Sequence, residues 1–221
     1  MKEKLTEEAV AMRAAKELQP GDYCNLGIGM PQLCALYVPQ GVHLQTQNGA
    51  LDFGPLITQE NVKQIDPDLI DAGGSFYTRA PGMSFFDVLT SFAMIRSGRM
   101  STILGGLQVS ERGDLAIHST SEADAYPQIG GAMDLAWGAK KVIVAMAHTT
   151  RDGKPKIVKE LTMPVSAQRC VDVVVTDIAV IEVTPAGLLL KELAPGWTPE
   201  EVQSQTGAQL IVTDDVKTVE L

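Results

Sequence analysis

The most informative segment for predicting the fold is Val42-His43-Leu44-Gln45-Thr46-Gln47-Asn48-Gly49-Ala50-Leu51-Asp52-Phe53-Gly54-Pro55. Its first half alternates and is rich in residues that suit a strand. Gln47-Asn48-Gly49 then predicts a tight turn, because Asn and Gly tolerate positive φ. The turn presents Gln47 at the carboxyl end of a strand, where open α/β sheets bind their ligands. An ordinary corner between strand and loop is the competing interpretation, since Asn-Gly is common in turns.

The composition is that of a globular chain with a substantial core. Of the 221 residues, 45% are hydrophobic and 20% are charged, and we predict one domain over residues 1–221. The net charge of −9 argues against a nucleic acid or an anionic membrane as partner. Cys24, Cys34 and Cys170 have no metal-ligand spacing and predict reduced thiols in the cytoplasm. We expect no signal peptide and no membrane-spanning segment.

Helix and strand signals alternate along the chain and predict an α/β fold. Helices are expected over 6–18, 31–37 and 85–97, after the glycines at 130–131, and from Thr198 onward. Strands are expected over 23–26, 42–45, 76–79, 101–104, 107–109, 115–117, 141–147, 171–175, 179–183, 187–191 and 209–212. The run 141–147 is continuously apolar, which is typical of a strand buried on both faces. In the helix 85–97, Ser84 is the expected cap, and Phe85, Val88, Leu89, Phe92 and Ile95 are expected to face inward.

Few side chains suggest chemistry when they are considered one at a time. The three histidines form no metal-ligand spacing. His43 lies in a strand and is expected to be a packed core residue, whereas His118 opens a polar loop and is the better catalytic candidate. His148 follows a buried strand, where structural and functional roles are equally open. Gly27 and Gly29 precede a helix start and suggest an anion-holding joint, with a packing turn as the alternative.

Eight short runs nevertheless match one pattern in collinear order. They are residues 25–31, 44–49, 54–55, 68–73, 84–87, 92–96, 104–109 and 130–135. Together they resemble the B (beta) subunit of class I CoA-transferases, of the 3-oxoacid, acetate/acetoacetate and oxoadipate type. The resemblance covers nearly the whole chain and is far more specific than any single motif.

The resemblance implies an open, mostly parallel sheet flanked by helices, of the CoA-transferase/NagB-like type, and a partner A subunit in an α2β2 assembly. It implies transfer of CoA between carboxylic acids, with the CoA thioester as a substrate, no permanently bound cofactor and no metal. A glutamate carboxylate attacks the thioester, and glycine-rich loops hold oxyanions with backbone N–H groups. The residues that the resemblance assigns to substrate and CoA binding are Asn25, Gly27, Gly29, Asn48, Gly49, Gly54, Gly105, Gly106, Gly130 and Gly131.

This chain departs from the family pattern at three places. Gln47 stands where the family has its nucleophilic glutamate, and an amide oxygen carries no charge and is a poor nucleophile. Asp52 stands where the family has glycine. Residues 118–128 replace a loop of the Pro-Gly-Lys type.

Three interpretations of these departures remain open. A Glu→Gln exchange made to trap a complex accounts for Gln47 alone. Divergence to decarboxylation or hydrolysis of an acyl-CoA accounts for all three, with Gln47 as a hydrogen-bond donor and His118, Glu122 or Asp52 in acid–base roles. The third is a protein that binds CoA esters without turnover. Glu60 offers another carboxylate, but no Gly follows its Asn, and we discount it.

Overall fold

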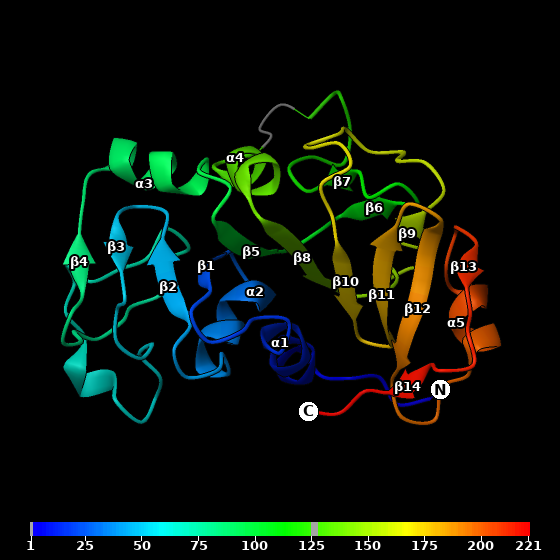
Figure 1. Ribbon diagram of the computed structural model, residues 1–221, viewed down its shortest axis with the longest axis horizontal. Coiled ribbons are helices and arrows are strands. Elements are labelled where there is room, and N and C mark those ends of the chain that lie inside the picture. Colours follow the sequence, from blue (N-terminus) through cyan, green and yellow to red (C-terminus); the bar gives the residue numbers. More distant parts are fainter. Residues whose placement is uncertain (1, 125–127) are drawn as a thin grey trace.

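The computed structural model describes residues 2–124 and 128–221 and is built on one long sheet (Figure 1). In the described residues this sheet has eleven strands, in the order β13-β12-β11-β10-β8-β5-β1-β2-β3-β4, with β14 beside β12. The strands are β1 (Tyr23–Leu26), β2 (His43–Thr46), β3 (Ala50–Leu51), β4 (Ser84–Phe85), β5 (Met100–Leu104), β8 (Lys141–Met146), β10 (Val173–Thr176), β11 (Ala179–Thr184), β12 (Gly187–Leu193), β13 (Leu210–Ile211) and β14 (Lys217–Thr218).

The centre of the sheet is parallel. Strands β2, β1, β5, β8 and β10 all run in the same direction, so their carboxyl ends meet at one edge. Antiparallel pairs continue the sheet on both sides, through β3 and β4 on one side and β11 and β12 on the other. The prediction of a mostly parallel α/β sheet is confirmed.

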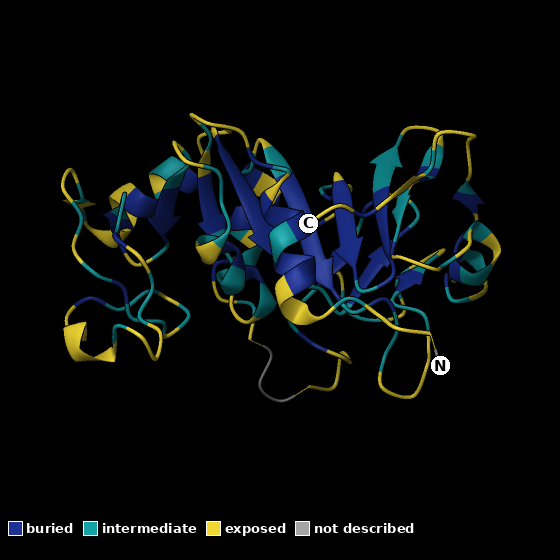
Figure 2. Cartoon of the chain, turned by 90° about the horizontal axis from the view of Figure 1, so that it is seen from below, coloured by how far each residue is buried: buried dark blue, intermediate teal, exposed yellow. Residues whose placement is uncertain are grey.

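Strand β8 demonstrates how the core is divided. Val142 and Val144 belong to a hydrophobic cluster on one face of the sheet, and Ile143 and Ala145 belong to a cluster on the other. Successive side chains of a strand point to opposite faces, so only a sheet covered on both sides buries all four. Figure 2 shows the buried residues concentrated in these central strands. The prediction of a strand buried on both faces is therefore confirmed.

Short helices cover the sheet, and three of them begin at a capping side chain. They are α1 (Glu7–Ala15), α2 (Met30–Leu33), which continues as the 3-10 turn η1 (Cys34–Leu36), α3 (Val88–Ile95), α4 (Ala132–Gly138) and α5 (Pro199–Ser204), with a further 3-10 turn η2 (Val62–Gln64). Thr6 caps α1 by accepting from the Ala9 N–H at 3.2 Å, as expected. Thr198 caps α5, with Pro199 in the first turn.

The prediction for the third helix was wrong at its start and in its inward face. Ser84 and Phe85 form β4 against β3, and the helix begins only after Asp87, whose carboxylate accepts from the Thr90 N–H at 2.9 Å. Val88 and Leu89 are exposed, as is Phe85, whereas Phe92 is half-buried and Ile95 is buried. An apolar helix pattern identifies a face that avoids water but does not say whether this chain covers that face.

Other parts also differ from the sequence prediction. Residues 76–79 make isolated bridges, Ile70 with Phe76 and Leu56 with Tyr77, rather than a strand. A second sheet of β7 (Leu115–Ala116), β6 (Gln108–Ser110) and β9 (Ile157–Val158) packs beside the main one, and β9 was not predicted. It is too short to carry a periodic signal. None of the helices in the described residues is both long enough and apolar enough to span a bilayer.

Candidate functional site

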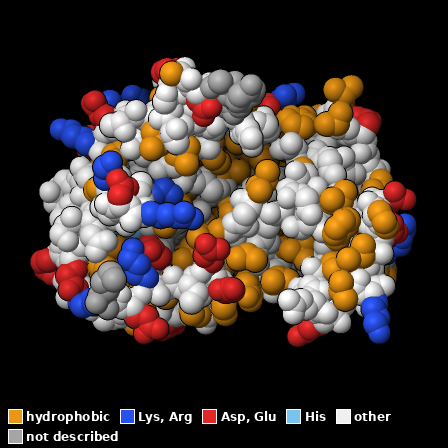
Figure 3. Space-filling view, turned by 180° about the vertical axis from the view of Figure 1, so that it is seen from behind, with side chains coloured by type: hydrophobic (Ala, Val, Ile, Leu, Met, Phe, Trp, Pro, Cys, Tyr) orange, Lys and Arg blue, Asp and Glu red, His pale blue; other side chains and the backbone are white. Residues whose placement is uncertain are grey.

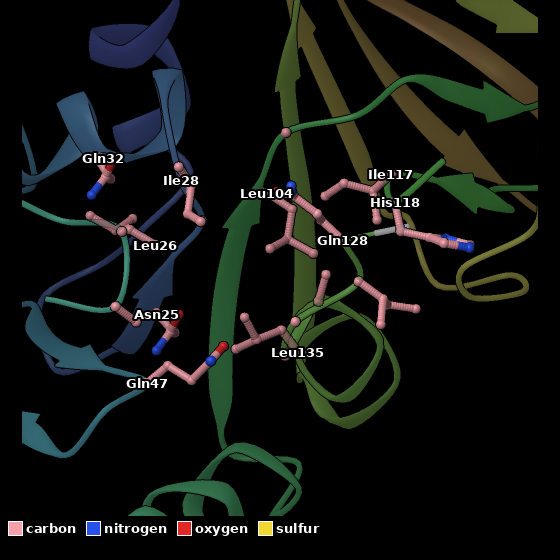
Figure 4. Close-up of a pocket in the computed structure, with 18 of the residues that line it drawn as sticks. Asn25, Leu26, Ile28, Gln32, Gln47, Leu104, Ile117, His118, Gln128 and Leu135 are labelled. Atoms are coloured by element: carbon pink, nitrogen blue, oxygen red, sulfur yellow. The ribbon is translucent and has the colours of Figure 1, made fainter. Parts of the chain in front are cut away.

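A cavity of about 770 Å³ opens at the carboxyl ends of β1, β2 and β5 (Figure 4). The segments that follow these three strands form one side, and residues 117–120 together with 128–132 form the other. Its wall combines leucines and isoleucines with a few amide side chains: Leu26, Ile28, Leu104, Leu107, Ile117, Ile129, Leu135, Asn25, Gln32, Gln45, Gln47 and Gln128. Largely apolar walls with a few convergent polar groups are typical of small-molecule sites.

Gln47 is the first residue after β2 and is half-buried in this wall. Its side-chain amide makes no hydrogen bond within the described part of the chain. Figure 4 shows it directed across the cavity toward Leu135. A Cβ added at Gly131 would lie 2.1 Å from Oε1 of Gln47, so the amide rests against a stretch of backbone that only glycine leaves open. The predicted turn therefore presents residue 47 to a cavity.

The turn itself is built from the residues that the sequence indicated. Gly49 has φ 117° and donates its N–H to the carbonyl of Thr46 at 3.0 Å, which closes the β2–β3 hairpin. A Cβ at Gly49 would lie 2.1 Å from the carbonyl oxygen of Phe86, so this glycine is needed for close packing as well as for its φ. Asn48 is exposed and bonds the carbonyl of Ile70 at 2.8 Å, outside the cavity wall.

The predicted glycines divide into two groups. Gly27, Gly105, Gly106, Gly130 and Gly131 line the cavity. Gly29, Gly49 and Gly54 lie outside its wall, and a Cβ at Gly54 would lie 2.4 Å from the Thr78 hydroxyl. The backbone can approach a ligand closely only in the first group.

His118 lines the cavity, but its ring points away from Gln47. Figure 4 shows the imidazole directed away from the side that carries Gln47. Its Nδ1 lies 2.6 Å from the hydroxyl of Ser166. The structure therefore does not bring His118 and Gln47 together.

Asp52 lies outside the cavity wall and is paired with a histidine. Its Oδ1 is 2.8 Å from Nδ1 of His43, and the His43 ring stacks on Tyr23 with centroids 4.6 Å apart. Asp52 has φ 56°, a conformation that favours glycine, so the pair with His43 holds a strained backbone. His43 is half-exposed in this pair rather than packed in the core.

A second polar cluster at the wall was not predicted. The Gln32 Nε2 donates to the Asp71 carboxylate at 3.1 Å and to the Ser75 hydroxyl at 2.9 Å, while its Oε1 accepts from the Gly29 N–H at 2.9 Å. Gly73 lies against the same amide. Only the run 68–73 in the family pattern signals this cluster, because its members come from separate segments of the chain.

The cysteines do not contribute a nucleophile to the cavity. Burial raises the pKa of Cys34 to about 12 and raises that of Cys24 still further, so both thiols stay protonated at neutral pH. Cys170 is half-buried, and burial raises its pKa to about 12 as well. None of the three lines the cavity.

Comparison with known proteins identifies the family. The coenzyme A transferase family matches residues 7–205, which include the turn and every segment of the cavity. The chain belongs to the coenzyme A transferase family. It is 46% identical to the B chain of the 3-oxoadipate CoA-transferase of Acinetobacter baylyi, over 94% of this chain and 96% of that protein. It is 42% identical to the beta chain of the acetate CoA-transferase of Escherichia coli K12, over 96% of each chain.

The fold agrees with a CoA-transferase of known structure. An acyl-CoA transferase from Escherichia coli O157:H7, solved as a thioester complex with CoA, superposes with a TM-score of 0.75 at 19% identity. The superposition covers 100% of this chain and 44% of that one, so this chain spans less than half the length of the solved protein. The predicted CoA-transferase-type sheet is thus confirmed.

Proposed function

We propose that this chain is the B (beta) component of a heteromeric, cytoplasmic CoA-transferase that acts on an acyl-CoA thioester. The observation that carries the proposal is the β2–β3 turn, which directs residue 47 into a cavity walled by glycine loops. The two relatives named above are the B and beta chains of transferases named for 3-oxoadipate and acetate. The CoA thioester is then a substrate, and no permanently bound cofactor is required.

In this proposal each part of the cavity has a role. The amide of Gln47 donates a hydrogen bond to the thioester carbonyl, because this side chain lines the cavity and has no hydrogen-bond partner in the described residues. Backbone N–H groups at Gly105, Gly106, Gly130 and Gly131 hold the oxygen on which charge develops. Covalent transfer through residue 47 requires a carboxylate, which this chain lacks there. Gln47 is therefore the group that limits exchange.

A partner A subunit completes the site in an α2β2 assembly. Phe85, Leu89 and Trp137 are 58%, 80% and 77% exposed on β4, α3 and α4, and α4 also contributes to the cavity wall. Hydrophobic side chains gather on the half of the molecule that carries β3, β4 and α3, beside a hollow in the same face (Figure 3). Contiguous exposed apolar groups of this kind mark protein interaction surfaces. We assign this surface to the A subunit.

The test is CoA exchange by the purified A–B complex, with acetyl-CoA as donor and acetoacetate or 3-oxoadipate as acceptor. We expect Gln47→Glu to raise exchange by at least about 10³-fold, because loss of a covalent nucleophile costs that much or more. The matched control is Gln128→Glu, which places the same carboxylate elsewhere on the cavity wall and should give no gain.

Other outcomes identify the alternatives. Release of CO₂ or free acid by the native complex, abolished by His118→Ala or Asp52→Asn, would indicate a decarboxylase or hydrolase instead. Binding of acyl-CoA without any product, with or without Gln47→Glu, would indicate a non-catalytic CoA-ester-binding protein. Either outcome would overturn CoA transfer.

A further inference from the structure

Ser91 is a fully buried residue of α3 that does not line the cavity but is bonded to residues that do. Its hydroxyl accepts a hydrogen bond from Nε2 of Gln45 at 2.7 Å and donates one to the main-chain carbonyl of Gln47, also at 2.7 Å. The hydroxyl therefore has a donor on one side and an acceptor on the other, both from the end of β2. This arrangement links α3 to the residue that faces the cavity.

The contact continues into β1 and β5 as one buried network. The side-chain oxygen of Gln45 accepts from Nδ2 of Asn25, and the main-chain carbonyl of Asn25 accepts from the Thr102 hydroxyl at 3.1 Å. Asn25, Gln45 and Thr102 are 1%, 3% and 0% exposed. Successive hydrogen bonds that run in one direction, away from water, polarise and strengthen one another. The network thereby joins two residues of the cavity wall, Asn25 and Gln47.

The two ends of the β2–β3 turn are held differently. At the far end, Gly49 is clamped by the backbone of Phe86, which donates its N–H to the Gly49 carbonyl at 3.0 Å. At the near end, the described residues supply one partner for the Gln47 carbonyl, the Ser91 hydroxyl. This hydrogen bond ties the main chain of residue 47 to α3. Without it the main chain at residue 47 is free to shift, and the side chain would shift with it.

We propose that Ser91 is a positioning residue for the acyl-CoA reaction: it fixes the peptide of residue 47 so that the side chain meets the reacting carbonyl. This inference rests on the proposed function of the cavity and adds a residue that the substrate does not touch. A displacement of about 1 Å between reacting groups can cost about 10²-fold in rate. The hydroxyl acts on the rate through geometry, with little effect on substrate affinity.

The test uses the A–B complex that carries Gln47→Glu, in which exchange is measurable. Adding Ser91→Ala should lower kcat by about 10- to 100-fold and change KM by less than about threefold. Ser91→Cys keeps the volume but has only a weak donor, so it should lose nearly as much. Ser110→Ala is the matched control, because Ser110 in β6 is equally buried but does not line the cavity. Its hydroxyl donates to the Asp114 carboxylate at 2.8 Å. This control should leave kcat within about twofold of the parent.

Amide hydrogen exchange of the same complexes separates this inference from the proposed function. The peptide covering residues 46–51 should exchange at least about tenfold faster in Ser91→Ala or Ser91→Cys, with no change for Ser110→Ala. A kcat within about threefold of the parent, or an unchanged turn, would overturn the positioning role. If Gln47→Glu gives no exchange activity, the proposed function fails, and the turn measurement still decides whether Ser91 holds residue 47.

Discussion

The carboxyl ends of the parallel strands form one edge of the sheet, but its two halves treat polar side chains differently. At β1, β2 and β5 the edge opens into the cavity, and the Gln47 amide faces it without a hydrogen bond from the described residues. At β8 and β10 the edge is closed. His148 is fully buried there, with one ring nitrogen 2.9 Å from the Thr176 hydroxyl and the other 2.9 Å from that of Thr206.

This difference shows that the end of a strand can form a ligand site only where the segments that cover the sheet edge leave space. Thr206, just after α5, covers His148, whereas Gly131, which has no side chain, leaves room for the amide of Gln47. A neutral imidazole has one donor and one acceptor, and two hydroxyls satisfy both. Buried polar groups that are fully paired contribute to stability, while an unpaired group beside a cavity is available to a ligand.

The largest effect on stability should come from replacing His148 in the closed half of the sheet edge. His148→Ala removes a fully buried ring together with its two hydrogen bonds and creates a cavity, which should lower the free energy of unfolding by about 3 kcal/mol. His43→Ala is the matched control, because this histidine is half-exposed, and it should cost less than about 1 kcal/mol. Urea denaturation measures both. A smaller loss for His148→Ala than for His43→Ala would contradict the comparison.

Lowering the pH should reduce the free energy of unfolding by a similar amount, through protonation of His148. Burial, with a smaller contribution from Lys4, lowers the pKa of His148 from 6.5 to about 4, and Asp177 opposes the shift. The unfolded chain therefore binds a proton that the folded chain rejects, so the contribution of His148 is complete above pH 6.5 and is lost as pH falls through 4. The loss amounts to about 3 kcal/mol.

Denaturation between about pH 7.5 and pH 4 tests this, with His148→Gln as the comparison. The difference in stability between the native protein and this variant should shrink as pH falls. A difference that stays constant across this range would show that His148 has the same pKa in the folded and unfolded states, and would contradict the lowered pKa.

The smallest effect should come from adding a methyl group to the cavity wall in the open half of the sheet edge. Gly131→Ala places a methyl group 2.1 Å from Oε1 of Gln47 and forces that flexible side chain to move. In the Gln47→Glu complex we expect about tenfold slower exchange and a stability change below about 1 kcal/mol. Gly105→Ala adds the same methyl group to the cavity wall with no atom within 4 Å, so it should slow exchange less. Equal effects would mean that crowding of the cavity, not contact with residue 47, is responsible.

Much of the fold was predictable because its signals are local. The Asn-Gly turn, the caps at Thr6 and Thr198 and the apolar run of β8 each depend on neighbouring residues. The error at α3 has the same origin. Val88 and Leu89 are apolar at helical spacing, but their exposure depends on what packs against the helix.

The candidate site was predictable only in part. The resemblance indicated Gln47, Asn25 and the glycines of the wall, and the structure places these around one cavity. Ser91 carried no signal of its own, since its partners Gln45 and Gln47 lie tens of residues away in the chain. His118 looked the better histidine for chemistry, but its ring bonds Ser166 and turns from the side that holds Gln47.

The order of residues alone determined the family, the strand that ends at Thr46 and the amide that follows it, because turn chemistry and motif identity are properties of short segments. Tertiary structure decided which strand ends stay open, which polar groups are paired and which apolar side chains remain exposed. These outcomes depend on contacts between distant segments, and a side chain's surroundings, rather than its type, determine whether it stabilises the protein or meets a ligand.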